Sequence, residues 1–201
     1  MTTQAAHLPY QGTMAGFRRF TVQEYHRLIA LGVLTEDDNL ELLEGYLVHK
    51  MSRNPPHDAA IQKGNKKWLR VLPSGWDLRV QSAITLAESE PEPDFTIVRG
   101  DETAYLTRHP SAADIGLLIE VSDSTLPGDR DDKGRIYARA GIACYWIVNL
   151  NDRQIEVYTS ASGPIPDPKF AQRVDYHVGD SIPLVLSGAA SIHVAVQDLL
   201  P

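Results

Sequence analysis

The sequence has few of the residues on which several classes of protein depend. It contains one cysteine, Cys144, so it cannot form an intramolecular disulfide or a thiol-rich zinc site. Because Cys144 falls inside an apolar run, we expect a buried, inert thiol. No apolar run approaches the roughly 20 residues of a membrane-spanning helix, and no basic segment followed by an apolar one begins the chain. We therefore expect a cytoplasmic protein without a membrane span or a secretory signal.

An excess of basic residues is also missing. The formal net charge of −7 argues against a protein that coats nucleic acid through bulk electrostatic attraction. It does not exclude an enzyme that acts on nucleic acid, because acidic residues around a metal ion contribute negative charge. The chain also lacks a G-x-S-x-G elbow, a P-loop and a dinucleotide-binding fingerprint, so the enzyme classes built on these motifs fit less well.

The length of 201 residues suits one domain with an arm. Thirteen prolines and 14 glycines favour strands and turns over a helical bundle. Residues 1–16 are small and polar without periodicity and predict a flexible arm, and residues 17–201 are expected to form a single domain.

Two short elements are predicted near the start of this domain. Thr21 and Glu24 have the spacing of a capping box, which predicts a helix through about Ala30. Residues 40–48 predict two short strands around a turn at Glu44 and Gly45. Glu44 is either a solvated turn residue or a carboxylate that reaches a functional site.

A longer helix is predicted from Pro55 to about Leu72. It carries four cations without interleaved acids, namely Lys63, Lys66, Lys67 and Arg70. A solvated charged face explains such a pattern, and contact with a phosphate backbone is the alternative hypothesis. A lone histidine, His57, stands at the start of the helix, where a cap or surface position is favoured over a metal ligand.

Two carboxylates stand out in the centre of the chain. After a predicted half-buried strand over residues 75–86, Asp94 follows a proline and precedes the apolar run 95–98, so it lies at the mouth of a strand. Glu120 is embedded in the apolar run 117–121, which predicts a central strand. An ionised glutamate there is costly unless it is paired, either with a metal ion or in a buried salt bridge.

A helix is predicted after the turn at residues 122–128. Asp129, Lys133 and Tyr137 recur at steps of four, which places them on one side of it. A plain salt bridge between Asp129 and Lys133 is an alternative role for this pair. The helix ends at Gly141 and the apolar run 144–148 follows, so strand, helix and strand predict a right-handed crossover between parallel strands.

The remaining residues predict strands and turns. A tight turn at residues 151–152 leads into an antiparallel strand over residues 154–158. Residues 172–178 and 181–186 predict a last hairpin, and residues 196–200 a short helical turn.

Two carboxylates on adjacent strands with a lysine nearby can hold a divalent cation and stabilise charge on a reacting phosphate. Hard oxygen ligands without thiols predict Mg²⁺ or Mn²⁺. Asp94 and Glu120 are the expected main ligands, helped by the backbone carbonyl of Val121. Lys133 is expected to orient the attacking water or to balance charge on the phosphate.

The order of these residues resembles the PD-(D/E)XK nuclease superfamily and, more closely, the Uma-type restriction endonuclease family. The matching pieces lie in family order at residues 20–25, 41–48, 79–81, 91–94, 118–122, 129–138 and 140–148. Together they span roughly residues 20 to 160, which makes the resemblance specific.

The resemblance implies an α+β restriction-endonuclease-like core, a central mixed sheet flanked by helices, with its metal site at Asp94 and Glu120. It implies Glu44 as a third acid and metal ligand, and Gln81 as a residue that lines the site. The lysine matches Lys133 on the helix, because Ser122 fills the usual place of the lysine in the E-x-K motif. It also implies a homodimer.

Two hypotheses on function follow. The chain is a Mg²⁺-dependent endonuclease that cleaves DNA, or a nuclease fold that serves as a nucleic-acid-binding or structural module with weak or lost catalysis. The presence of Asp94, Glu120 and Lys133 together favours the first hypothesis, and the acidic net charge slightly favours the second.

Overall fold

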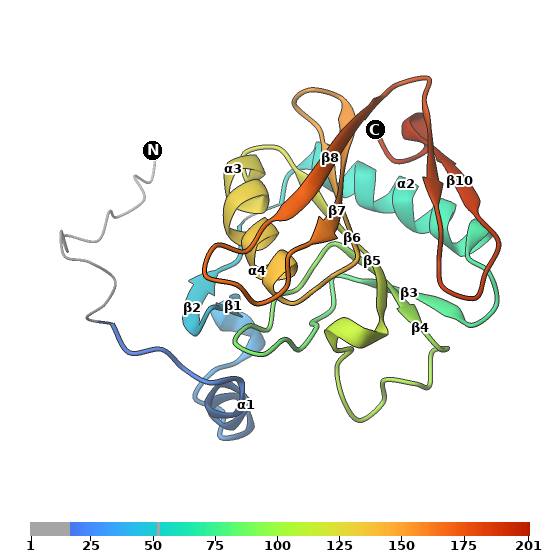
Figure 1. Ribbon diagram of the computed structural model, residues 1–201. Helices are drawn as coiled ribbons and strands as arrows, with labels where there is room; N and C mark the ends of the chain where they lie inside the picture. The colour runs from blue at the N-terminus through green and yellow to red at the C-terminus, as the bar shows by residue number, and fades with distance from the viewer. Residues whose placement is uncertain (1–16, 52) are drawn as a thin grey trace.

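The computed structural model describes residues 17–51 and 53–201, and it is built on a six-stranded mixed sheet in the order β3-β4-β5-β6-β7-β8 (Figure 1). The strands are β3 (Trp76–Val80), β4 (Phe95–Arg99), β5 (Ile115–Ser122), β6 (Cys144–Asn149), β7 (Gln154–Ala161) and β8 (Phe170–His177). β5 and β6 are parallel, as predicted, and the other neighbours are antiparallel. The arm expected over residues 1–16 lies outside the described residues.

Each face of the sheet is covered by different elements. α2 (Pro55–Val71) covers one face together with the hairpin of β9 (Ser181–Leu184) and β10 (Ile192–Ala195), and the helical segment Leu126–Arg139 covers the other (Figure 1). Trp68 packs on Trp146 in the first core, with ring centroids 5.8 Å apart. Tyr137 packs on Tyr145 in the second, at 5.0 Å. The chain thus has the mixed sheet flanked by helices that was predicted.

The first elements form as the sequence predicts. α1 (Val22–Ala30) opens with the capping box, in which the amide of Glu24 donates to Thr21 Oγ1 at 3.1 Å. β1 (Leu40–Leu43) and β2 (Tyr46–His49) form a hairpin around Glu44 and Gly45. The amide of Glu90 donates to the carbonyl of Leu42 at 2.7 Å, which fixes this hairpin beside the segment that leads into β4.

Gly45 is required at this turn for two reasons. Its φ of 81° lies in the left-handed region. A Cβ atom there would also lie 2.7 Å from Cβ of Arg19, which is closer than two carbon atoms can pack.

Two predicted boundaries differ in the structure. The strand predicted over residues 75–86 ends at Val80, because Gln81 has a φ of 47° and breaks the extended backbone. The helix predicted from Asp129 begins at Leu126 and runs as α3 (Leu126–Gly128), the π-helical turn η4 (Asp129–Lys133) and α4 (Gly134–Arg139).

The predicted last hairpin is wrong. β8 pairs with β7 at the edge of the sheet, and β9 pairs with β10 in a separate hairpin. Alternation of apolar and polar residues indicates a strand and its buried face, but it does not identify the neighbouring strand.

Short 3₁₀ turns complete the chain at η2 (Glu36–Asp38), η3 (Ala112–Asp114) and η5 (Val196–Asp198), the last where a helical turn was predicted. Within residues 17–51 and 53–201, no helix combines the length and the apolar character that crossing a membrane requires.

Candidate active site

A cavity of about 410 Å³ opens where β4 and β5 meet the β1–β2 hairpin, the start of α2 and the segment α3–η4. Its wall includes the three residues predicted as catalytic, Asp94, Glu120 and Lys133, together with Gln81. The structure therefore brings together residues that span more than 50 positions of the sequence.

Asp94 stands immediately before β4 and is buried. Its Oδ1 accepts a hydrogen bond from Gln81 Nε2 at 3.1 Å, and its Oδ2 accepts one from the amide of Val121 at 2.9 Å. Nε2 of His57 lies 3.1 Å from the same Oδ2. Burial raises the pKa of Asp94, but the hydrogen bonds and the charge of His57 outweigh it, so the pKa lies below its usual range.

The place of Val121 follows from the sheet register. The last paired residues of β4 and β5 on this side are Phe95 and Ile119, so beyond them the amide of Val121 reaches the Asp94 side chain instead of a β4 carbonyl. The predicted role of the Val121 carbonyl as a metal ligand stays a prediction.

Glu120 lies in the central strand β5 with only 3% of its surface exposed. Its Oε1 accepts hydrogen bonds from Tyr137 Oη at 2.7 Å and from Lys133 Nζ at 3.0 Å. Burial raises the pKa of this carboxyl to about 8, against the attraction of Lys133. The prediction that Lys133 and Tyr137 face the same side as Asp129 agrees with these contacts.

Lys133 is surrounded by carboxylates. Its Nζ lies 3.9 Å from Oε1 of Glu41 and 3.9 Å from Oδ1 of Asp129, besides the bond to Glu120. Burial disfavours the ammonium, but the attraction of the three acids outweighs it and raises the pKa of Lys133. The lysine ends the π-helical turn, and such turns are frequent at functional sites.

Glu41 is the residue of this site that the sequence analysis missed. It is buried in β1 and its Oε2 accepts a hydrogen bond from the amide of Glu92 at 3.1 Å. The same pattern that identified Glu120 also identifies Glu41, because it is a carboxylate within an apolar strand (Leu40-Glu41-Leu42-Leu43).

Glu44, the predicted third acid, is placed elsewhere. Its carboxylate pairs with Arg135 at 2.7 Å and with Arg139 at 2.6 Å, and it is not among the described residues that line the cavity. Its φ of 49° interrupts the extended backbone, so side chains no longer alternate between the two faces of the hairpin at this residue. The Glu44 side chain points toward Arg135 and Arg139 of α4. Glu41 takes the position near Lys133 that was expected for Glu44.

The four cations of α2 are not at the cavity. Among the described residues that line it, none of Lys63, Lys66, Lys67 and Arg70 occurs. Lys63 Nζ donates to the carbonyls of Gln197 at 3.0 Å and Leu200 at 2.6 Å, and Lys67 pairs with Asp198 at 2.8 Å. Two of the four therefore hold the C-terminal segment. Their contact with DNA stays a prediction.

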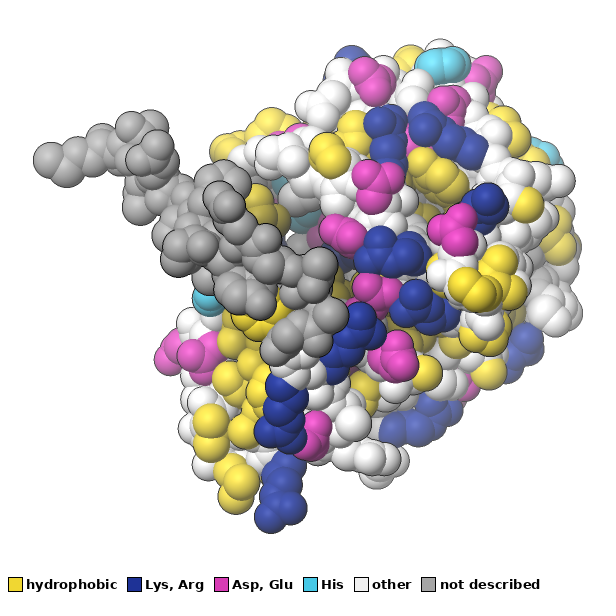
Figure 2. Space-filling model, turned by 60° about the vertical axis from the view of Figure 1, so that its left-hand side comes forward, with side chains coloured by type: hydrophobic (Ala, Val, Ile, Leu, Met, Phe, Trp, Pro, Cys, Tyr) yellow, Lys and Arg dark blue, Asp and Glu magenta, His cyan; other side chains and the backbone are white. Residues whose placement is uncertain are grey.

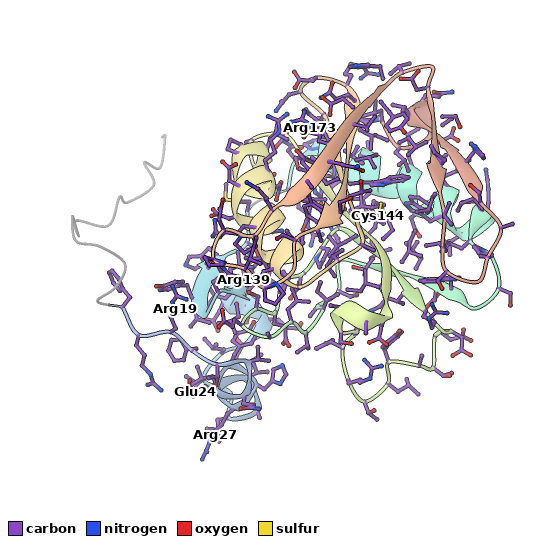
Figure 3. All side chains as sticks on the ribbon, viewed as in Figure 1. Arg19, Glu24, Arg27, Arg139, Cys144 and Arg173 are labelled. Carbon is purple, nitrogen blue, oxygen red and sulfur yellow. The ribbon has the colours of Figure 1, made fainter. Side chains whose placement is uncertain are left out.

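The surface shown in Figure 2 mixes Lys and Arg side chains with Asp and Glu side chains. Ion pairs between exposed side chains agree with this mixture, since Arg135 pairs with Asp132 and Arg173 pairs with Asp175. Away from the cavity, Cys144, which was expected to be buried, is half-buried (Figure 3). Its Sγ accepts a hydrogen bond from Trp146 Nε1 at 3.1 Å, and burial raises the pKa of its thiol to about 11.

Two carboxylates of the site keep oxygen lone pairs that a cation could use. In the part of the chain that the structure describes, no three acidic, histidine or cysteine side chains form a ready cluster for a metal ion. Both hydrogen bonds to Glu120 use Oε1, and Asp94 Oδ1 accepts one. A carboxylate oxygen has two lone pairs, so Oε2 of Glu120 and one lone pair of Asp94 Oδ1 are available. These hard oxygens suit Mg²⁺ or Mn²⁺.

The chain is similar to one protein family and to a solved structure. The family model Uma2, described as "Putative restriction endonuclease", matches residues 22–193. A solved structure, a "putative nuclease belonging to DUF820" from Anabaena variabilis ATCC 29413, superposes with a TM-score of 0.64 at 14% sequence identity, over 90% of this chain and 97% of that one. At this identity the likeness shows the fold. The chain has no match among curated proteins.

Proposed function

Since the chain belongs to the Uma2 family of restriction-endonuclease-like nucleases, we propose that it is a metal-dependent endonuclease that hydrolyses phosphodiester bonds of DNA. The observation that carries the proposal is the convergence of Asp94, Glu120 and Lys133 on one cavity at the end of adjacent strands. A cytoplasmic location would give such an enzyme access to DNA.

The metal is proposed to be Mg²⁺ or Mn²⁺. Asp94 and Glu120 would hold it, with Glu41 as the third acid and the Val121 carbonyl as a further oxygen. When bound, it would supply Lewis-acid stabilisation of the phosphate and a more acidic water. The raised pKa of Glu120 fits this role, because a divalent cation favours the ionised carboxylate over the protonated one.

Residues of the chain would balance the charge of the phosphate and orient the two carboxylates. Lys133 is a fixed cation at the wall of the cavity, where it can balance charge that develops on the phosphate. Tyr137 holds one oxygen of Glu120 and Gln81 holds one oxygen of Asp94, so both carboxylates are oriented before a substrate binds.

A nuclease fold that binds nucleic acid without cleaving it is the second candidate. The observation that favours it is the position of Lys133, whose ammonium lies within 4 Å of three acids and can compensate their charge without a metal ion. In that case the buried carboxylates and the lysine would be a salt-bridge network that stabilises the fold.

A homodimer is proposed as the form in which the protein acts. β8 ends the order of the sheet, so no strand among the described residues pairs with its outer edge. If two β8 strands paired antiparallel about Val174, Arg173 would lie opposite Asp175 of the partner subunit on both sides of the axis. Val174 is 50% exposed, so this pairing would also bury apolar surface.

A cleavage assay tests the proposed function. Purified protein is incubated with supercoiled plasmid in Mg²⁺, in Mn²⁺ and in chelator, beside Asp94→Ala. The control Asp77→Ala removes an acid on the neighbouring strand β3 that is not among the described residues lining the cavity.

Cleavage that needs metal, persists in Asp77→Ala and vanishes in Asp94→Ala supports the nuclease. Intact plasmid with all three folded proteins, when short and single-stranded substrates also survive, supports the binding module instead.

A further inference from the structure

His57 lies at the candidate site, and not at the cap or on the surface as the sequence suggested. Asn54 is the N-cap of α2, and its Oδ1 accepts a hydrogen bond from the His57 amide at 3.1 Å. Pro55 and Pro56 occupy the first helical turn, where their fixed φ favours one backbone path. The imidazole is thereby directed into the cavity, and its side chain is only 14% exposed.

Only one ring nitrogen of His57 has a hydrogen-bond partner in the described part of the chain. Nε2 lies 3.1 Å from Asp94 Oδ2. Nδ1 is buried without a partner, and its closest acid, Oδ1 of Asp58, is 3.8 Å away, beyond a hydrogen bond. A hydrogen on Nε2 is therefore favoured whether the ring is neutral or charged, and it is donated to Asp94.

The two carboxylate oxygens of Asp94 therefore differ in how many lone pairs remain available. Oδ2 accepts two hydrogen bonds, from His57 and from the Val121 amide, which use both of its lone pairs. Oδ1 accepts one, from Gln81, which leaves one lone pair. Without His57, each oxygen would have one lone pair available.

We propose that His57 is a positioning residue that keeps Asp94 Oδ2 occupied, so that a divalent cation binds Asp94 through Oδ1 alone. The inference rests on the proposed metal site and adds the residue that sets how Asp94 binds the metal. Partners of this kind, which orient a ligand without touching the metal, change metal affinity by about 10- to 100-fold when they are removed.

Mn²⁺ binding by the purified full chain, measured by calorimetry in the absence of DNA, tests the inference. His57→Ala is expected to weaken Mn²⁺ binding at least about tenfold. His57→Gln, whose amide nitrogen can donate to the same oxygen, is expected to bind within about threefold of the wild type. His49→Ala is the matched control, because His49 also lines the cavity but is not among the described residues that donate a hydrogen bond to Asp94. Thermal unfolding of each variant checks that the fold is kept.

Each outcome decides a different point. Equal Mn²⁺ affinity in the wild type and in folded His57→Ala overturns the positioning role, while loss in Asp94→Ala keeps the metal site. Equal loss in His57→Ala and His57→Gln also overturns it and makes His57 a direct ligand. If the wild type binds no Mn²⁺, or if Asp94→Ala binds it unchanged, the proposed metal site fails and the inference with it.

Discussion

Lys133 Nζ lies 3.0 Å from Glu120 Oε1, and the same ammonium is within 4 Å of Glu41 and Asp129. One buried cation thus compensates three acids that the sequence separates by up to 88 positions from Glu41 to Asp129. The consequence is that stability and the proposed chemistry depend on the same side chain.

Lys133→Met tests this dependence, because it removes the charge and keeps most of the side-chain volume. In chelator at pH 8, the free energy of unfolding is expected to fall by about 3 kcal/mol, since breaking a buried ion pair leaves uncompensated charge. Added Mn²⁺ is expected to restore part of the loss, because a divalent cation replaces the missing positive charge. Urea unfolding with and without Mn²⁺ measures both effects.

Lys169→Met is the matched control for this substitution. Lys169 is 72% exposed and lies 3.8 Å from Asp167. Exposed pairs contribute little, so a change below about 0.5 kcal/mol is expected, with or without Mn²⁺. Equal losses in the two variants would show that Lys133 is not the cation on which the acids depend.

Glu41→Gln and Glu44→Gln distinguish the acid that the structure places at the site from the one that the sequence predicted. Glu41→Gln is expected to slow metal-dependent plasmid cleavage by about 100-fold or more, because a carboxylate that would help to hold the metal ion is lost. Glu44→Gln is expected to keep the rate within about threefold and to lower stability by about 1 kcal/mol through its pairs with Arg135 and Arg139. The opposite ranking of the two rates would restore Glu44 as the third acid.

Glu41 and Glu44 show which residues of the site could be predicted from the sequence and which could not. Asp94 and Glu120 were found because a carboxylate at the mouth or in the middle of an apolar strand is costly without a partner. Glu41 carries the same signal, but the resemblance to the nuclease family implied Glu44 as the third acid instead. Choosing between them required the backbone angle at Glu44, which no pattern of residue types specifies.

Three contacts between elements show which tertiary features a sequence can predict and which it cannot. The parallel pairing of β5 and β6 was predicted because a helix connects them. The pairing of β8 with β7 was not, because strand patterns carry no information on the neighbour. The contact of His57 with Asp94 depends on where a helix begins relative to a strand, which is a tertiary property.

Glu120 is expected to make the metal-free protein less stable as pH rises from about 5 to 8. Its pKa is about 8 in the folded chain against an ordinary value of 4.5, so between these values the folded state binds more protons than the unfolded state. Stability contributed by this group is present below the unfolded pKa and is lost as pH rises through the folded one. The slope is at most about 1.4 kcal/mol per pH unit.

Urea unfolding of the wild type and of Glu120→Gln at pH 5, 6, 7 and 8, in chelator, measures this effect. The pKa of His57 is also raised, by its bond to Asp94, and acts in the same direction, so the difference between the two proteins isolates Glu120. Asp94 and Glu156 have lowered pKa values and act in acid, below this window. Parallel pH profiles for the two proteins would mean that Glu120 stays ionised.

Paired charge reversals on β8 test the proposed dimer. Arg173→Asp places two acids opposite each other at each end of the antiparallel pairing, and Asp175→Arg places two bases there, so each variant alone is expected to be a monomer. An equimolar mixture is expected to form a heterodimer, because every opposed pair then carries opposite charges. Sedimentation velocity measures the masses.

The mixture separates the interface from the contacts within one strand. Arg173 also pairs with Asp175 of its own chain, at 2.7 Å, and both single variants lose that pair. Mixing cannot restore it, since each chain keeps two like charges, so recovery of a dimer in the mixture can come only from contacts between chains. A monomeric wild type would contradict the proposed dimer. Dimers that persist in each variant alone would show that the interface does not lie at β8.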